Sequence, residues 1–255
     1  MMCGQNSLEL MNELSKENLD QYCNKEDLEL LIINILDIDR NFLYRENPTL
    51  NENQTILLKK SIVRRNLGEP LAYILGNKGF WNLDLLVNQN VLVPRPETEL
   101  LVEKVLSFYD SKPLKLLDLG TGSGAIGISL FSERPLWDVY CSDLSYKALQ
   151  VALENKKNNQ VNVYLIHANW LNAFCKNSFD VIVSNPPYVD QNDERLLEDG
   201  VSFEPLEALV AQEGGLKDIK HIILNAKKYL RDNGSLIIEH APEQSKDVID
   251  LFERN

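Results

Sequence analysis

Apolar residues in the N-terminal part of the chain recur at spacings of three and four, the pattern of helices that bury one face. Residues 27–37 and residues 53–67 each carry such a stripe. The stripes consist of Leu28, Leu31, Ile32 and Ile35 in the first segment and of Ile56, Leu57, Ile62 and Val63 in the second. Gly68 then ends the second segment as a left-handed cap, and Pro70 lies just beyond it. The pattern predicts a small helical domain over residues 1–76.

Over residues 77–95 the spacing of apolar residues changes to nearly every second position, which is the period of a strand. Asn88-Gln89-Asn90 is a turn sequence within this stretch, so we expect a β-hairpin that turns there and links two domains. Pro94-Arg95-Pro96 then forces extended backbone, and Pro96 followed by acidic residues is typical of a helix start. We therefore expect a second domain over residues 96–255.

Short apolar runs alternate with amphipathic segments in this second domain. The alternation predicts strands over residues 114–119, 138–142, 161–166, 179–184 and 235–239, and helices over residues 125–132, 146–155, 216–230 and 243–253. Apolar runs of this kind are buried on both faces of a parallel sheet. The pattern predicts an α/β fold with a doubly wound sheet, which binds ligands at the C-terminal ends of its strands.

Composition and charge exclude several classes of protein. With 44% hydrophobic and 25% charged residues, the 255-residue chain has the composition of a globular protein. Its N-terminus lacks the pattern of a secretion signal, and apolar runs are shorter than the roughly 18 residues of a membrane helix, so we expect a cytoplasmic protein without a membrane segment. A net charge of −12 opposes binding to duplex nucleic acid. The histidines and Cys3, Cys23, Cys141 and Cys175 lack metal-ligand spacing, which predicts no metal site and no disulfide framework.

Asp118-Leu119-Gly120-Thr121-Gly122-Ser123-Gly124 follows the first predicted strand of the α/β domain and leads into a helix. Glycines at this point let the backbone approach a ligand closely. Asp143 ends the next strand, where an acidic side chain binds ribose hydroxyls. The spacing fits the fingerprint of an NAD-type cofactor and also the loop that binds S-adenosylmethionine in methyltransferases. Asp118 and the third alternate glycine, Gly124, favour S-adenosylmethionine.

Asn185-Pro186-Pro187-Tyr188 follows a later strand and is therefore predicted at the same edge of the sheet. Two successive prolines stiffen a loop and leave its carbonyl oxygens free as acceptors. The Asn185 side-chain oxygen and the Pro186 carbonyl can hold both hydrogens of an NH2 group, while Tyr188 offers a flat wall. Such a grip orients the nitrogen toward a methyl donor. The segment predicts methyl transfer to an amide or to an exocyclic amine.

In this order, the motifs resemble those of the HemK-type family, the glutamine N5-methyltransferases of peptide chain release factors, over essentially the whole chain. The resemblance rests on residues 69–76 (Glu-Pro-Leu-Ala-Tyr-Ile-Leu-Gly), 94–99 (Pro-Arg-Pro-Glu-Thr-Glu), 118–124, 185–189 and 203–209 (Phe-Glu-Pro-Leu-Glu-Ala-Leu). It implies a helical N-terminal domain that docks the release factor and a Rossmann-like class I methyltransferase domain. It also implies methyl transfer from S-adenosylmethionine to the glutamine of the Gly-Gly-Gln loop, by an enzyme that we expect to be monomeric.

The resemblance assigns roles to residues of this chain. It implies cofactor binding by Gly120, Thr121, Gly122, Ser123, Gly124, Asp143, Trp170 and Asn185. It implies catalytic roles for Asn185, Pro186 and Tyr188, with Pro187 completing the loop that grips the glutamine amide.

Two departures from the family pattern leave alternatives open. Asn169 stands where the family has an acidic residue before the tryptophan, which bears on cofactor affinity. The family's sheet has two further strands after the helix predicted over residues 243–253, and we expect this C-terminal strand pair to be missing here. A truncated, inactive cofactor-binding homologue is therefore one alternative. An adenine-N6 DNA methyltransferase is another, because such enzymes hold an NH2 group with a similar loop.

Overall fold

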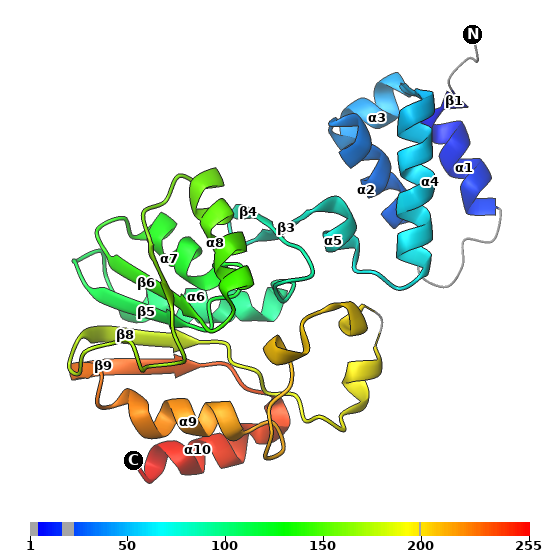
Figure 1. Cartoon of the computed structure of the whole chain (residues 1–255). Helices are drawn as coiled ribbons and strands as arrows, with labels where there is room; N and C mark the ends of the chain where they lie inside the picture. The colour runs from blue at the N-terminus through cyan, green and yellow to red at the C-terminus, as the bar shows by residue number, and fades with distance from the viewer. Residues whose placement is uncertain (1–4, 17–22, 199) are drawn as a thin grey trace. The chain divides into compact units, whose positions relative to one another are not determined.

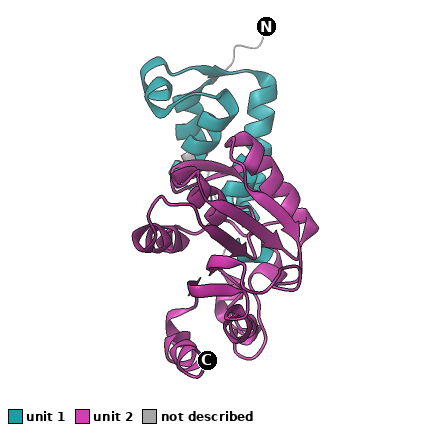
Figure 2. Cartoon of the chain, turned by 90° about the vertical axis from the view of Figure 1, so that its left-hand side faces the viewer, with its two compact units in different colours: residues 1–76, 199–203 teal, residues 77–198, 204–255 magenta. Residues whose placement is uncertain are grey.

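The computed structural model describes residues 5–16, 23–198 and 200–255. The chain divides into two compact units, one of residues 1–76 with 199–203 and one of residues 77–198 with 204–255 (Figure 2). The stretch of residues 77–95, predicted as a linker hairpin, falls inside the second unit. Each unit has a hydrophobic core of its own.

The first unit is helical. It contains α1 (Ser7–Lys16), α2 (Lys25–Leu36), α3 (Arg40–Glu46), α4 (Glu52–Asn66), α5 (Leu71–Leu75), the 3-10 turn η3 (Val201–Phe203), and a short antiparallel pair of β1 (Gln5–Asn6) and β2 (Thr49–Leu50). Asn24, Asp39 and Asn51 cap α2, α3 and α4, since each side chain accepts a backbone N–H three residues further on. Apolar spacing located α2 and α4 but missed α1, α3 and α5, of which α3 and α5 have only seven and five residues.

The apolar face predicted for α4 is wrong at three of its four positions, and only Ile62 is buried. Ile56, Leu57 and Val63 are exposed, whereas α4 buries Leu58, Ser61 and Ile62. One turn after Ser61, Arg65 forms an ion pair with Asp27 of α2, with 2.9 Å between Arg65 Nε and Asp27 Oδ2. This ion pair and the buried residues lie on the same side of α4. The ion pair therefore favours burial of this side of the helix over the more apolar side.

The hairpin forms, but its turn lies earlier than predicted. Strands β3 (Asn77–Phe80) and β4 (Leu83–Leu86) pair antiparallel, and Trp81 and Asn82 connect them. Trp81 adopts a left-handed φ of 54°. Its backbone N–H donates to Glu99 and its indole N–H to Glu133, each over 2.8 Å, so tertiary contacts hold a turn that the sequence does not announce. Residues 88–90 form a separate turn after the hairpin.

A five-stranded parallel sheet with the order β7-β6-β5-β8-β9 forms the centre of the second unit. The strands are β5 (Lys115–Leu119), β6 (Asp138–Asp143), β7 (Tyr164–His167), β8 (Phe179–Ser184) and β9 (Leu230–Ile238). The helices are η1 (Pro96–Thr98), α6 (Glu99–Phe108), α7 (Ala125–Glu133), α8 (Tyr146–Asn158), η2 (Glu194–Leu197), η4 (Leu206–Ala208), α9 (Lys217–Ala226), η5 (Pro242–Gln244) and α10 (Ser245–Glu253).

Helices cover both faces of this sheet (Figure 1). Helices α6 and α7 pack with one set of strand residues, including Leu116 and Val181, and α8 lies on the same face. Helix α9 packs with the alternate set, including Leu117 and Ile182, and α10 packs on α9. The predicted doubly wound α/β architecture is therefore confirmed.

Two strand boundaries differ from the prediction by more than one residue. Strand β7 begins at Tyr164 rather than residue 161, because the backbone N–H of Val161 still closes the end of α8 on Lys156. Strand β9 begins at Leu230 rather than residue 235, with a register shift opposite β8. Arg231 in this irregular stretch forms an ion pair with Asp180 of β8, which keeps the early part of β9 against the sheet.

Among the described residues, none of the helices combines the length and apolarity that crossing a bilayer would require. The same part of the chain contains no cluster of His, Cys, Asp and Glu suited to a metal ion. Cys23 and Cys141 are buried free thiols and Cys175 is an exposed one, while Cys3 lies outside the described residues.

Candidate active site

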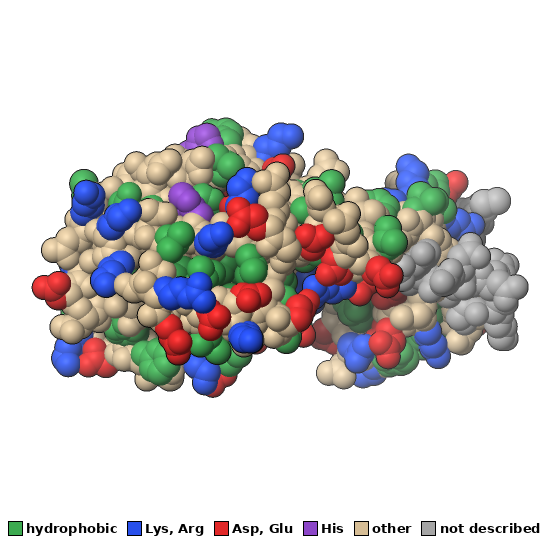
Figure 3. Space-filling view, turned by 90° about the horizontal axis from the view of Figure 1, so that it is seen from below, with side chains coloured by type: hydrophobic (Ala, Val, Ile, Leu, Met, Phe, Trp, Pro, Cys, Tyr) green, Lys and Arg blue, Asp and Glu red, His purple; other side chains and the backbone are tan. Residues whose placement is uncertain are grey.

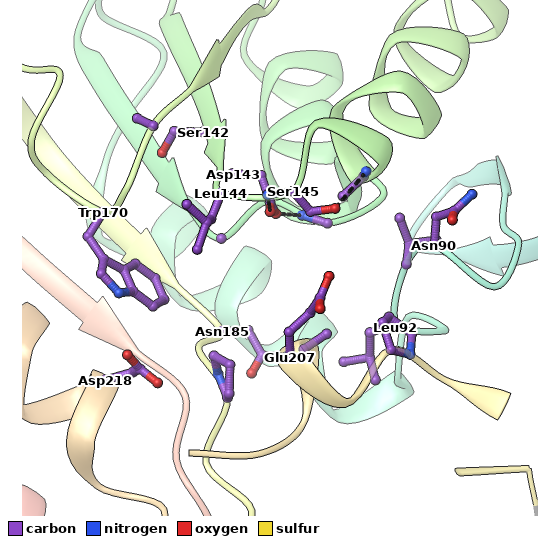
Figure 4. Close-up of a pocket in the computed structure, with 18 residues that line it drawn as sticks. Asn90, Leu92, Ser142, Asp143, Leu144, Ser145, Trp170, Asn185, Glu207 and Asp218 are labelled. Atoms are coloured by element: carbon purple, nitrogen blue, oxygen red, sulfur yellow. Dashed lines mark hydrogen bonds between the residues drawn. The ribbon is translucent and has the colours of Figure 1, made fainter. Parts of the chain in front are cut away.

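A pocket of about 430 Å³ opens at the C-terminal edge of the sheet (Figure 4). Its volume is in the range of small-molecule sites. Predicted site residues that line it are Gly120, Gly122, Asp143, Trp170, Asn185 and Pro187. They follow β5, β6, β7 and β8, so the topology brings the predicted motifs to one edge.

The glycine-rich loop forms one wall of the pocket. Gly120 and Gly122 have φ values of 71° and 56°, which favour glycine, and a Cβ atom built on Gly122 would meet no heavy atom within 4 Å. This opening leaves room for a ligand beside the backbone. Thr121, Ser123 and Gly124 are buried within the loop and do not line the pocket.

Asp118 supports this loop from below. The carboxylate is fully buried, and its Oδ2 accepts hydrogen bonds from Thr121 Oγ1 at 2.6 Å and from the backbone N–H of Gly127 at 2.9 Å. Burial raises the pKa of Asp118 to about 6, although both hydrogen bonds oppose the shift. Its other oxygen, Oδ1, is buried without a hydrogen-bond partner among the described residues. A buried carboxylate oxygen beneath the loop can therefore accept one more hydrogen bond.

Asp143 lines the pocket at the end of β6 and is held there by backbone groups. Its Oδ2 accepts the N–H of Gly122 and its Oδ1 accepts the N–H of Ser145, each at 2.8 Å. Burial raises the pKa of Asp143, and the two hydrogen bonds act in the opposite direction. Because each carboxylate oxygen has a second lone pair, Asp143 can still accept hydroxyl donors from a ligand.

Trp170 and Asp218 lie together at another wall (Figure 4). Trp170 has a left-handed φ of 46°, and its ring lies 3.5 Å from a Cβ built on Gly120. Burial raises the pKa of Asp218, whereas a hydrogen bond from Trp170 lowers it. Asp218, an acid in the first turn of α9, was not predicted as a site residue. Asn169, which the sequence singled out, is exposed and does not line the pocket.

The Asn185-Pro186-Pro187-Tyr188 segment is held by three other elements. Asn185 Nδ2 donates to Thr98 Oγ1 at 3.0 Å, and the Tyr188 hydroxyl donates to Glu239 Oε1 at 3.2 Å. Gln244 Nε2 donates to the Tyr188 carbonyl at 2.9 Å. Pro186 is buried, and neither it nor Tyr188 lines the pocket. Burial and the nearby Glu239 raise the pKa of Tyr188 to about 12.

An ion pair between a buried carboxylate and a partly exposed guanidinium connects two further motifs. Glu204 lies in the segment of residues 203–209, and its Oε1 is 2.5 Å from an Arg95 guanidinium nitrogen in the segment of residues 94–99. Glu204 Oε2 accepts the backbone N–H of Val93 at 3.0 Å. The pair anchors the segment that brings Pro205, Glu207 and Ala208 to the pocket. No spacing rule predicts this contact, because its partners are 109 residues apart.

Comparison with known proteins identifies both parts of the chain. The family model described as a methyltransferase small domain matches residues 96–201, and that of the PrmC N-terminal domain matches residues 12–76. A release factor glutamine methyltransferase from Salmonella typhimurium is 38% identical over 248 residues, which cover 96% of this chain and 89% of that protein. The chain belongs to the release factor glutamine methyltransferase family. Members from Escherichia coli (38% identical, covering 89% of this chain and 83% of theirs) and Coxiella burnetii (41%, covering 89% and 82%) are also similar to it.

Solved structures confirm the class I methyltransferase fold. A methyltransferase from Pyrococcus furiosus aligns with a TM-score of 0.51 and 16% identity, covering 80% of this chain and 87% of that one. A 16S rRNA methyltransferase from T. thermophilus, in complex with AdoMet and guanosine, aligns with a TM-score of 0.51 and 17% identity. That match covers 70% of this chain and 44% of the other. At these identities the likeness concerns the fold alone.

Proposed function

We propose that this chain transfers a methyl group from S-adenosylmethionine to the side-chain amide nitrogen, N5, of the glutamine in the Gly-Gly-Gln loop of peptide chain release factors. The observation that carries the proposal is a single pocket lined by Gly120, Gly122 and Asp143 on one side and by Asn185 and Pro187 on another. A cofactor loop and an amide-gripping loop therefore face the same space. Family membership supplies the substrate class.

The charges around the pocket suit S-adenosylmethionine better than a dinucleotide. Asp143, Glu207 and Asp218 line the pocket, and the buried Asp118 lies beneath the loop, so a pyrophosphate would face several carboxylates. Asp118 also takes the N–H of Gly127 in the first turn of α7, where dinucleotide-binding folds place a phosphate. S-adenosylmethionine, when bound, supplies a methyl group on a positively charged sulfur. Carboxylates stabilise that charge and the ammonium group beside it.

We assign cofactor binding to the glycine-rich loop and to the residues across from it. The assigned residues are Gly120, Thr121, Gly122, Ser123, Gly124, Asp143, Trp170 and Asn185. In this proposal Thr121, Ser123 and Gly124 act through the shape of the loop, since they do not line the pocket. Asp143 accepts ribose hydroxyls, and Trp170 contacts the adenine ring.

We assign the grip on the substrate amide to Asn185, Pro186, Pro187 and Tyr188. In this proposal the Asn185 side-chain oxygen, at the pocket wall, and the carbonyl of Pro186, which is buried beside it, accept the two hydrogens of the glutamine NH2 group. The nitrogen then faces the methyl donor. An amide nitrogen is a poor nucleophile because its lone pair is delocalised, and most of the gain comes from orientation. Tyr188 stiffens the loop through its hydrogen bond to Glu239.

The helical unit is the proposed docking site for the release factor. Ile56, Val63 and Leu67 follow one another at spacings of seven and four, on one side of α4 and at its C-terminal end. Their side chains are 47%, 59% and 71% exposed. This exposed apolar stripe is the kind of surface that a protein partner covers.

The proposed substrate places the enzyme in the cytoplasm, where release factors act in translation. A net charge of −12 favours a protein partner over nucleic acid. All proposed contacts to cofactor and amide come from the second unit of one chain, so a monomer is sufficient for the reaction.

The direct test is to incubate the protein with labelled S-adenosylmethionine and an unmethylated release factor, and to analyse its Gly-Gly-Gln peptide by mass spectrometry. We expect a mass shift of one methyl group on the glutamine. Asn185→Ala should lower the rate about 100-fold or more, because the amide is no longer oriented. Asn162→Ala, at an exposed position outside the pocket, is the control. Cofactor binding without any methylated peptide would favour the inactive homologue instead.

A further inference from the structure

Asn185 must present its side-chain oxygen, not its NH2 group, if it is to accept a hydrogen from the substrate amide. An Asn side chain has a donor end and an acceptor end of nearly the same shape, so packing alone does not select one. The selection has to come from hydrogen-bond partners on the side away from the pocket. Thr98 and Glu239 occupy that side.

Thr98 is 4% exposed, and its Oγ1 receives the Asn185 Nδ2 group at 3.0 Å. A threonine hydroxyl can both accept and donate, so on its own it would tolerate either orientation of the amide. Glu239 removes this freedom. Glu239 Oε1 accepts the Tyr188 hydroxyl at 3.2 Å, while Glu239 Oε2 is buried without a hydrogen-bond partner among the described residues. Burial raises the pKa of this carboxylate, and Thr98 and Asn185 are close enough to it to lower that pKa. An ionised carboxylate can only accept hydrogen bonds, so the Thr98 hydroxyl has to donate its hydrogen to Glu239. The Thr98 oxygen then accepts a hydrogen bond from the Asn185 NH2 group.

We propose that Thr98 and Glu239 are positioning residues that fix the Asn185 amide with its oxygen toward the substrate. In this arrangement Asn185 donates to Thr98, the Thr98 hydroxyl turns its hydrogen to Glu239 Oε2, and Tyr188 donates to the other oxygen of the same carboxylate. The network joins η1, the loop after β8 and the end of β9. Neither Thr98 nor Glu239 lines the pocket, so they act through Asn185. This inference rests on the proposed function, in which Asn185 grips the glutamine amide.

The arrangement predicts different effects for substitutions that keep or remove single hydrogen bonds. Thr98→Val preserves the shape of the side chain but removes its hydroxyl, whereas Thr98→Ser keeps the hydroxyl. Glu239→Gln places an NH2 donor where wild type has only acceptors. The Thr98 hydroxyl can then accept from the introduced NH2 group and donate to Asn185, which allows the opposite orientation of the Asn185 amide. Thr49→Val, in β2 of the first unit, is the matched control for loss of a threonine hydroxyl.

The test measures kcat and KM on the release factor, together with the dissociation constant for S-adenosylmethionine and urea unfolding. We expect Thr98→Val and Glu239→Gln to lower kcat about 10- to 100-fold with cofactor affinity and stability nearly unchanged, and Thr98→Ser to restore most of kcat. Thr98→Val or Glu239→Gln with kcat within about twofold of wild type would overturn the inference. A loss that parallels a loss of stability or cofactor affinity would overturn it too, because it would indicate general packing.

A second readout separates this inference from the proposed function. In the 15N spectrum of the full chain, the Asn185 NH2 signals are identified by their absence in Asn185→Ala. We expect their hydrogens to exchange slowly with water in wild type and in Thr98→Ser, and about 10-fold faster or more in Thr98→Val. If wild type methylates no release factor, the proposed function fails and this exchange measurement alone decides the orientation. Unchanged exchange in Thr98→Val would show that Thr98 does not hold the amide.

Discussion

The buried carboxyl group of Asp118, beneath the glycine-rich loop, makes the stability of the protein depend on pH. Its pKa in the folded protein is about 6, compared with 3.8 for an unperturbed aspartate. As the pH falls, the folded protein therefore binds this proton before the unfolded chain does, and proton binding by the folded state adds stability. The ionised carboxylate destabilises the fold at neutral pH, and protonation relieves this cost.

Asp118→Asn removes this titration and isolates it from the other carboxyl groups. We expect wild type to gain about 1 kcal/mol in free energy of unfolding relative to the variant between about pH 7 and about pH 5. Urea denaturation of both proteins at a series of pH values measures the difference. Parallel pH dependence of the two proteins would mean that Asp118 does not change its protonation in this range.

At the residue scale, the sequence located side chains that belong to a local motif but not those that meet them from elsewhere. Gly122 and Asp143 were predicted from the spacing of glycines and acids after successive strands, and both line the pocket. Thr98 and Glu239 were missed as partners of the Asn185-to-Tyr188 loop, because 87 and 51 residues separate the hydrogen-bonded pairs. Their proximity depends on the strand order, in which β8 lies between β5 and β9.

At the level of elements, α4 carries apolar side chains on two sides, and only one of them packs in the core of its own unit. Ile56, Val63 and Leu67 remain exposed. Under the proposed function this stripe contacts the release factor but not a short Gly-Gly-Gln peptide. Val63→Asp should therefore raise KM for the intact release factor about 10-fold, while the rate on the peptide stays at the wild-type value.

Ile249→Asp is the matched control for Val63→Asp, because Ile249 is an exposed residue of α10 in the second unit. Steady-state kinetics on both substrates would separate docking from chemistry. An equal loss on factor and peptide would count against docking by α4. The stripe also explains why periodicity misled the prediction for this helix, since apolar spacing cannot tell a partner-binding side from a core side.

The Arg95 and Glu204 pair joins two sequence motifs into one element of the pocket wall. The Arg95 side chain is 38% exposed, so water solvates its charge when the Glu204 carboxylate is removed. Glu204→Ala also deprives the Val93 N–H of its acceptor. We expect the variant to lose about 2 kcal/mol of stability, mainly through the unpaired buried N–H of Val93. It should also bind S-adenosylmethionine more weakly, because Glu204 anchors the segment of residues 205–208.

Urea denaturation and calorimetric titration with the cofactor measure the two effects. Glu213→Ala is the control, since it removes an exposed ion pair with Lys220, for which a loss below about 1 kcal/mol is expected. Glu204→Ala and Glu213→Ala with the same stability would show that the contacts of Glu204 are not structural. The two motifs were recognised separately in the sequence, and their direct contact emerges only from the fold.

At the scale of the whole molecule, the distribution of charge separates the two reactions that an Asn-Pro-Pro-Tyr loop can serve. The chain carries 26 Lys and Arg against 38 Asp and Glu. On the face formed by α9 and α10, basic and acidic side chains are intermixed (Figure 3), as in the ion pairs of Lys220 with Glu213 and of Arg254 with Asp250. A phosphate backbone requires a continuous basic surface, which this face does not provide (Figure 3).

We therefore expect no methylation of duplex DNA by this enzyme. Plasmid DNA and an unmethylated release factor, incubated in parallel with labelled S-adenosylmethionine, should give label in the protein only. Low ionic strength is the most demanding condition, because phosphate attraction is then strongest and a weak basic site has its best chance to bind. An adenine base would also have to leave the duplex before it could reach a pocket lined by Asp143, Glu207 and Asp218. Methylated adenine in the plasmid would contradict this assignment and revive the DNA methyltransferase alternative.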